Sequence, residues 1–245
     1  MGRLVGRVLD LVYPATCLVC DRPVAGANTI CGACFATLRP ITAPCCPVLG
    51  LPFEADPGSE VVSAEALADP PPFRRARAAL VYNDPAARIV SRLKYGDRPE
   101  LAGFCAALMV QAGADFWADG PMLVPVPLHA HRFVHRRYNQ SAELARALAR
   151  RTGCACRIDL VRRVRATRQQ VGLSAGARQR NVSGAFAAHP RLAAILAGRP
   201  VLLIDDVYTT GSTLKALTRC LKRAGVEHID VLSFARVVSG EAIPI

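Results

Sequence analysis

The residues with the clearest chemical meaning lie in the stretch VLLIDDVYTTGST, at positions 201–213 of this 245-residue chain. Apolar residues at 201–204 predict a short buried strand, and two carboxylates, Asp205 and Asp206, follow where that strand is expected to end. The hydroxyl-rich run TTGST comes next and leads directly into leucines at helical spacing. A loop at a helix N-terminus presents free backbone N–H groups to an anion, and a glycine lets the backbone approach it closely. The stretch therefore predicts a phosphate-binding loop.

The paired carboxylates need a second explanation, because negative charge beside the loop would repel a bare phosphate. A sugar phosphate resolves the conflict. Its phosphate enters the loop, while Asp205 and Asp206 accept hydrogen bonds from vicinal ribose hydroxyls or hold a metal-bound water of Mg²⁺. The alternative is that the acidic pair merely ends a strand and the TTGST run merely caps a helix. The order of strand, acidic pair, loop and helix favours the sugar phosphate.

This order resembles the phosphoribosyl pyrophosphate (PRPP) motif of type I phosphoribosyltransferases. The whole chain resembles the ComF family, a phosphoribosyltransferase-like group linked to competence and DNA uptake. The further matching segments are the paired CxxC motifs, LKYG at 93–96, VPVPL at 124–128, RRYNQ at 136–140, RVRATRQQ at 163–170, then Arg178, Asn181 and GAF at 184–186.

The resemblance implies a type I phosphoribosyltransferase fold, an α/β class with a Rossmann-like parallel sheet, that binds PRPP with Mg²⁺. Asp205 and Asp206 would be the catalytic pair. The phosphate-binding residues would be Thr209, Thr210, Gly211, Ser212 and Thr213. Lys94 and Tyr95 recur in the family pattern, but LKYG alone is a weak signal.

The positive charge of the chain is concentrated in one interval. The net charge is +12, yet residues 121–200 hold fifteen arginines, no lysine and two acidic residues, a local charge of +13. A loop at 128–139 in this interval corresponds, by the resemblance, to the pyrophosphate-binding loop. Because the arginine fork binds diphosphates in a bidentate way, Arg132, Arg136 and Arg137 are predicted to bind pyrophosphate, whereas the arginines of the helix that follows are interpreted as a solvated face.

A second loop in the basic interval, residues 163–185, is long enough to be a lid. By the resemblance it corresponds to the flexible catalytic loop of the family. The residues assigned to it are Arg163, Thr167, Gln170, Arg178 and Asn181.

Four of the ten cysteines form two CxxC pairs, Cys17 with Cys20 and Cys31 with Cys34. In a cytosolic chain this spacing indicates one tetrahedral Zn²⁺ rather than disulfides. Four thiolates leave no position for water, so the Zn²⁺ is expected to be structural. A second zinc site is interpreted as lost, because leucine and alanine stand where further ligands would fall, although Cys46 is an alternative ligand.

The remaining pattern organises the chain into an N-terminal helix and zinc module (1–50), a connector (51–72) and a phosphoribosyltransferase-like domain (73–245). Strands are expected at 78–82, 123–126, 201–204 and 229–237, and helices at 85–94, 100–112, 141–151 and 212–224. Alternating strands and helices predict a parallel sheet with its ligand site at the carboxyl ends of the strands.

We therefore expect a PRPP-binding, phosphoribosyltransferase-like protein, linked to DNA uptake or nucleotide metabolism, whose acceptor the sequence does not identify. The alternative is a non-catalytic DNA-binding or DNA-uptake accessory factor that keeps a PRPP-type pocket. The expected partners are PRPP or ribose 5-phosphate, single-stranded DNA and the DNA-uptake machinery, the last docked through the zinc module in a scaffold role. No apolar run approaches the roughly 20 residues that span a bilayer, and no persuasive signal peptide is present, so we expect a cytoplasmic protein without membrane insertion.

Overall fold

The computed structural model describes residues 15–58, 61–95, 100–128, 138–165 and 184–238. Its strands are β1 (Ala76–Val81), β2 (Met122–Pro125), β3 (Val161–Arg163), β4 (Phe186–Ala188), β5 (Val201–Tyr208) and β6 (Ile229–Arg236). Its helices are α2 (Gly32–Ala36), α3 (Ala64–Ala68), α4 (Asp84–Tyr95), α5 (Leu101–Ala112), α6 (Ala114–Trp117), α8 (Gln140–Thr152), α10 (Leu192–Leu196) and α11 (Ser212–Arg223).

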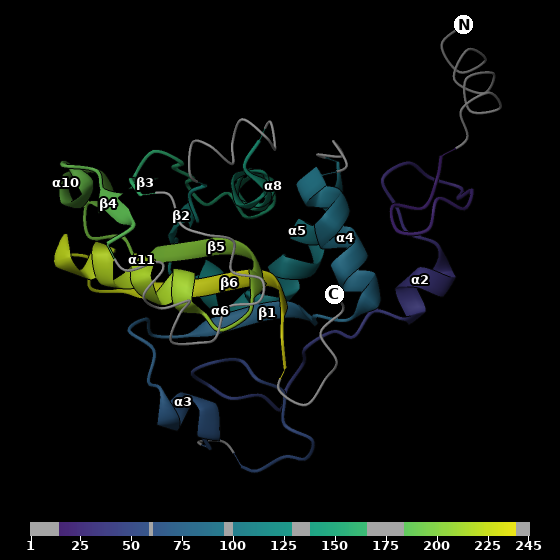
Figure 1. Cartoon of the computed structure of the whole chain (residues 1–245), viewed down its shortest axis with the longest axis horizontal. Coiled ribbons are helices and arrows are strands. Elements are labelled where there is room, and N and C mark those ends of the chain that lie inside the picture. The colour runs from purple at the N-terminus through teal and green to yellow at the C-terminus, as the bar shows by residue number, and fades with distance from the viewer. Residues whose placement is uncertain (1–14, 59–60, 96–99, 129–137, 166–183, 239–245) are drawn as a thin grey trace, which may run out of the picture.

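Four of the strands form a parallel sheet in the order β1-β6-β5-β2 (Figure 1). Leu203 of β5 pairs with Val231 of β6 on one side and with Val124 of β2 on the other, so β5 is an interior strand. The predicted α/β class with a parallel sheet is confirmed. The carboxyl ends of β5 and β6 lie together at one edge, where such sheets bind their ligands.

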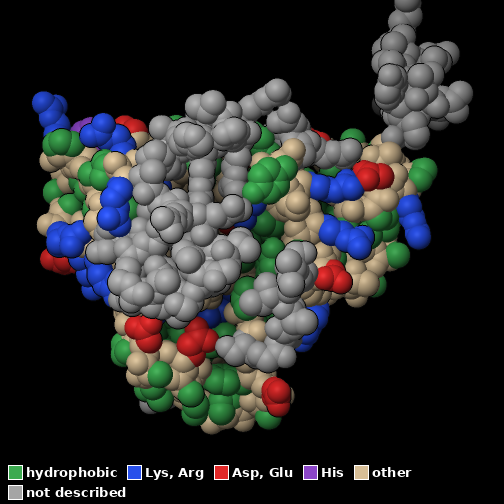
Figure 2. Space-filling view, viewed as in Figure 1, with side chains coloured by type: hydrophobic (Ala, Val, Ile, Leu, Met, Phe, Trp, Pro, Cys, Tyr) green, Lys and Arg blue, Asp and Glu red, His purple; other side chains and the backbone are tan. Residues whose placement is uncertain are grey.

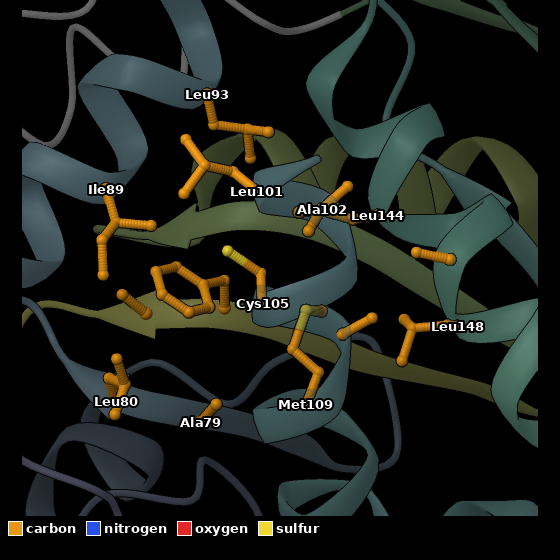
Figure 3. Packing of buried hydrophobic residues seen from close by; sticks show 14 of the residues in the cluster. Ala79, Leu80, Ile89, Leu93, Leu101, Ala102, Cys105, Met109, Leu144 and Leu148 are labelled. Atoms are coloured by element: carbon orange, nitrogen blue, oxygen red, sulfur yellow. The ribbon is translucent and has the colours of Figure 1, made fainter. Parts of the chain in front are cut away.

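Alternate residues of the interior strands build two separate cores. Leu202 and Ile204 of β5 belong to the cluster formed with α4, α5 and α8, whose side chains converge over the sheet in Figure 3. Val201 and Leu203 belong to the cluster on the α11 side. The sheet is therefore covered on both faces, as its continuous apolar strands require.

Helix α8 has strong local signals at both ends. The Asn139 side chain accepts a hydrogen bond from the Ser141 N–H and caps the N-terminus, and Gly153 ends the helix with φ 74°, a left-handed conformation that glycine adopts without strain. These two residues set where α8 begins and ends, and the helix packs against β5 and β2. The first residues of α8 consequently lie near the carboxyl end of β5.

The N-terminal cysteine segment packs directly against the sheet domain. Cys17 and Leu18 are buried in the same cluster as Leu80 of β1. The chain then runs beside β1, where Pro40 forms an antiparallel bridge with Leu80 and the Ile41 N–H donates to the Ala79 carbonyl at 3.0 Å. The segment is thus part of the packed structure.

Strands β3 and β4 flank the predicted lid on its two sides. Strands β3 and β4 pair antiparallel, with Arg163 opposite Phe186. The two ends of the predicted lid are therefore held together.

Among the described residues, no helix combines the length and apolarity needed to cross a membrane.

Candidate functional site

The two carboxylates lie inside a strand. Strand β5 runs from Val201 to Tyr208, so the expectation that it ends at 204 was wrong. Its backbone stays paired with β6 as far as Tyr208, opposite Arg236. Because this pairing needs only backbone groups, two polar side chains do not interrupt it.

Helices α4 and α8 bring polar groups onto the carboxylates. Lys94, from the last turn of α4, places its Nζ 2.8 Å from Asp206 Oδ2. The same Asp206 oxygen accepts from Gln140 Nε2 at 3.2 Å, and Asp205 Oδ1 accepts from the Ser141 hydroxyl at 3.1 Å. Three segments far apart in sequence thus meet at the acidic pair.

One atom of this cluster has no partner among the described residues. Gln140 is 5% exposed, and its Oε1 accepts no hydrogen bond there, although its Nε2 is used by Asp206. A buried acceptor without a donor is costly, so such atoms in native proteins call for a partner. Gln140 Oε1 therefore adds an acceptor for a hydroxyl beside the two carboxylates.

The electrostatics of the pair separate the two acids. Burial, and then the adjacent charge of Asp206, raise the pKa of Asp205 to about 7, although the Asp206 N–H, Lys94 and Ser141 oppose the rise. Asp206 has the Lys94 ammonium as its direct counter-ion. The site consequently carries one compensated carboxylate and one that gains its charge near neutral pH.

The phosphate loop lies between β5 and α11. Gly211 adopts φ 68° and precedes the first residue of α11, whose N-terminus receives no hydrogen bond from a capping side chain. The Thr210 and Ser212 hydroxyls lie 2.8 Å apart. Because the residue at the cap position is a glycine, no cap side chain occupies the N-terminus of α11, as a phosphate-binding loop requires.

Gly211 has no room for a side chain. A Cβ atom there would lie 2.4 Å from the Tyr208 hydroxyl and 2.6 Å from its Cζ. Gly211→Ala is expected to destabilise the protein by about 1–2 kcal/mol for the left-handed backbone alone, and to weaken ribose 5-phosphate binding about tenfold by displacing the loop. Thermal unfolding and calorimetry measure the two effects. Gly198→Ala is the matched control, since Gly198 also has positive φ but no atom within 4 Å of an added Cβ; wild-type affinity in both variants would contradict the prediction.

The four CxxC thiols form one cluster. The Sγ atoms of Cys17, Cys20, Cys31 and Cys34 all lie within 4.8 Å of one another. Cys20 and Cys31 are 3.7 Å apart, close to the roughly 3.8 Å that tetrahedral Zn–S bonds of about 2.3 Å require. The cluster therefore fits one structural Zn²⁺.

Backbone groups support the cluster from outside. The Cys17 Sγ accepts from the Cys31 N–H at 3.2 Å and from the Val19 N–H at 3.4 Å. Burial opposes ionisation of Cys17, but these donors outweigh it and lower its pKa to about 6. These hydrogen bonds thus stabilise the thiolate form of Cys17 without help from a metal ion.

Comparison with known proteins identifies the family. Competence protein ComFC of Bacillus subtilis is 25% identical over 244 residues, covering 93% of this chain and 97% of that protein, and Competence protein F of Haemophilus influenzae is 34% identical over 163 residues, covering 63% and 69%. DNA utilization protein YhgH of Salmonella typhimurium is 34% identical over 234 residues, covering 93% of this chain and all of that protein. The chain belongs to the ComF family. Residues 8–65 match a double zinc ribbon domain and residues 139–242 a phosphoribosyl transferase domain.

A solved structure adds no independent argument. The HGPRT-ase from Leishmania tarentolae aligns with 65% of this ComF chain and 73% of its own length at 17% identity, but the TM-score is 0.30. The assignment of the family therefore rests on the sequence relatives.

The second ribbon of this ComF protein does not fit a metal ion. We call residues 45–66 the metal-free ribbon. Cys46 Sγ accepts from the Ser63 hydroxyl at 3.2 Å and from the Leu49 and Ser63 N–H groups at 3.4 Å. Leu49 and Ala66, where CxxC spacing would place thiols, are buried in the hydrophobic core. Cys45 and Cys46 are the only cysteines between residues 45 and 66, and this stretch has no histidine. A structural Zn²⁺ site uses four Cys or His ligands, so hydrogen bonds and packing hold this ribbon.

The structure places part of the predicted site. It brings Lys94 onto Asp206, whereas Tyr95 at the end of α4 has a side chain that is 65% exposed. Arg163 lies in β3 with its guanidinium 5.5 Å from the centre of the Phe186 ring. The residues Arg132, Arg136, Arg137, Thr167, Gln170, Arg178 and Asn181 lie outside the described part of the chain, so their roles stay predictions.

Two residues that contact the carboxylates, Gln140 and Ser141, were not predicted as site residues. From the sequence, Gln140 was assigned only to the RRYNQ motif and Ser141 only to the start of a helix. Both are buried, which is unusual for polar residues at a helix N-terminus. The signal that could have found them is their place on the sheet-facing side of an amphipathic helix that begins near the carboxyl ends of the strands.

Proposed function

We propose that this ComF protein binds PRPP with Mg²⁺ and transfers or recognises its phosphoribosyl group, in the cytoplasm. The observation that carries the proposal is the juxtaposition of a glycine loop at an uncapped helix N-terminus with Asp205 and Asp206 on the preceding strand. The loop suits a phosphate, and the two carboxylates suit ribose hydroxyls.

The charge of the acidic pair supports a hydroxyl-binding role. Asp206 is already paired with Lys94, which reduces its attraction for a directly coordinated cation. Gln140 Oε1 offers a further acceptor beside it. We therefore assign the pair to the ribose, with Mg²⁺ reached through its waters and the diphosphate.

In the proposed reaction a nucleophile forms a bond to the anomeric carbon of PRPP while the bond to pyrophosphate breaks, through an oxocarbenium-like transition state. The residues of this chain contribute by orienting the ribose, and Mg²⁺, when bound, offsets charge on the departing diphosphate. Arg136 and Arg137 are proposed to contact that diphosphate, and the 163–185 loop to exclude water. The acceptor is left unassigned.

A second candidate function, binding of single-stranded DNA, is favoured by the basic end of the molecule. Figure 2 shows Lys and Arg side chains gathered over the end that carries α10, β4 and the C-terminal part of α11. The exposed basic residues of these elements and their flanks include Arg162, Arg191, Arg199, Arg219, Lys222 and Arg223. A charged surface of this kind suits a phosphate backbone, and relatives carry the names "DNA utilization" and "Competence".

One titration series tests whether Arg136 and Arg137 bind the diphosphate or DNA. Replacing Arg136 and Arg137 with alanine is expected to weaken PRPP and pyrophosphate binding much more than ribose 5-phosphate binding, because only the first two carry a diphosphate. Calorimetry with and without Mg²⁺, repeated with single-stranded DNA present, measures this. The matched control is Arg146 and Arg150 to alanine, on the exposed face of α8.

The outcomes are distinct. If the arginines belong to a DNA track instead, the double variant should lower DNA affinity for all sequences and reduce the salt slope by about two. Competition between DNA and PRPP would indicate a shared surface. Absence of PRPP binding by the wild-type protein with Mg²⁺ would refute the proposed function.

A further inference from the structure

Arg236 is an arginine buried at the end of the sheet. It is the last residue of β6 and is 1% exposed. Its Nη1 donates to the Leu49 carbonyl and its Nη2 lies 3.4 Å from Glu65 Oε1, so both partners belong to the metal-free ribbon. Burial lowers the pKa of the guanidinium. A charge is kept at such depth only when its contacts compensate the lost hydration.

The same guanidinium reaches the phosphate loop through one aromatic ring. Its Cζ lies 4.4 Å from the centre of the Tyr208 ring, and Phe73 meets that ring edge-on at 6.4 Å. The Tyr208 hydroxyl in turn lies against Gly211, where it leaves no space for a Cβ. Arg236 and Tyr208 thus form a continuous contact from the ribbon to the loop glycine.

The other side of the loop is tied to the same region of the chain. Lys215, in the first turn of α11, is 9% exposed and donates to Asp69 at 2.7 Å, directly after α3. Its backbone N–H donates to the Gly211 carbonyl at 2.7 Å. Residues before and after the loop are therefore both held by the ribbon and its C-terminal extension.

We propose that the metal-free ribbon is the fixed support of the phosphate loop, and that Arg236 is the positioning residue that transmits this support. The inference rests on the proposed function, since it assigns the supported loop to a phosphoribosyl ligand. A loop that binds through backbone N–H groups needs them held in place before the anion arrives. In this protein the second ribbon lacks a full set of zinc ligands, and its packing supplies that rigidity.

The test compares Arg236, at the end of β6, with Arg75, which directly precedes β1. Arg236→Met removes the guanidinium while keeping an extended side chain. Arg75→Met is the control, because Arg75 also lies over an aromatic ring, Phe116 at 5.1 Å, and near a carboxylate, Asp230 at 3.7 Å, but at the opposite end of β6. We expect Arg236→Met to weaken ribose 5-phosphate and inorganic phosphate binding about tenfold, with Arg75→Met within about twofold of wild type. Arg236→Lys, which keeps the charge, should recover part of the affinity.

A measurement without ligand tests the support of the loop separately from phosphate binding. Amide hydrogen exchange of residues 209–215 should accelerate in Arg236→Met and stay at the wild-type rate in Arg75→Met, at a temperature where both are folded. If the wild type binds neither phosphate compound, the proposed function fails while this exchange result still decides whether the ribbon supports the loop. Equal exchange of 209–215 in both variants, or unchanged affinity in Arg236→Met, would overturn the proposal.

Discussion

Asp205→Asn combined with Asp206→Asn is expected to weaken ribose 5-phosphate binding by at least about 100-fold. Each carboxylate is proposed to accept a hydrogen bond from a ribose hydroxyl, and a hydrogen bond to a charged group contributes roughly 1.5–3 kcal/mol. The double change also leaves Lys94 without its counter-ion. The added positive charge attracts the anionic ligand and offsets part of this loss. Isothermal titration of wild type and variant gives the ratio directly.

Inorganic phosphate is the control ligand for this variant. It has no ribose, so its affinity should stay the same or rise, because the loop at 209–213 is intact and two negative charges beside it are removed. Equal loss for phosphate and ribose 5-phosphate would mean that the carboxylates hold the loop rather than the sugar. Equal ribose 5-phosphate binding by wild type and variant would remove the pair from the site.

The stability of the single variant Asp205→Asn, relative to wild type, is expected to depend on pH. The folded-state pKa of Asp205 is raised to about 7, above the roughly 3.9 of an unfolded chain, so the folded protein holds the extra proton between these values. The contribution of Asp205 to stability is therefore present below about pH 4 and is lost as the pH rises to about 7. The variant, whose Oδ1 can still accept from Ser141, should be more stable than wild type at pH 8 by over about 1 kcal/mol, and equal to it near pH 4.

Cys17→Ser is expected to remove the bound zinc and unfold the N-terminal module. Cys17 is the fully buried member of the thiol cluster, and its Sγ accepts two backbone N–H groups. A segment this short gains its folding free energy from the metal. Metal analysis should fall from about one equivalent per chain to near zero, and limited proteolysis should cut between 15 and 38. Because Leu18 shares a core with β1, the melting temperature of the sheet domain should fall as well.

Cys46→Ser is the matched control, since Cys46 is also fully buried and also accepts backbone N–H groups, but in the metal-free ribbon. It should keep about one equivalent of zinc. Zinc lost from Cys46→Ser but retained by Cys17→Ser would show that the ligands had been misassigned. Wild-type protein purified without chelator that contains no zinc would contradict the metal site altogether.

Local patterns in the sequence determined most of the elements. The spacing of leucines and the flanking glycines predicted α11 and its end. An asparagine at the start of α8 and a glycine at its end mark the limits of that helix. The CxxC pairs indicated the zinc cluster because a two-residue gap is itself a geometric constraint on two thiols. Such signals are readable because they depend on neighbours in the chain.

The end of β5 and the partners of its carboxylates were decided by tertiary structure. An apolar pattern reports burial, so it stopped at 204, whereas the backbone pairing of Tyr208 with Arg236 continues the strand through two acidic residues. Lys94 and Gln140 meet Asp206 only because α4 and α8 pack on the same face of the sheet. The burial of Arg236 likewise depends on the ribbon that covers it, since the same arginine in an isolated strand would remain in water. The sequence by itself determined which groups could do the chemistry, and the packing of distant segments decided which of them meet.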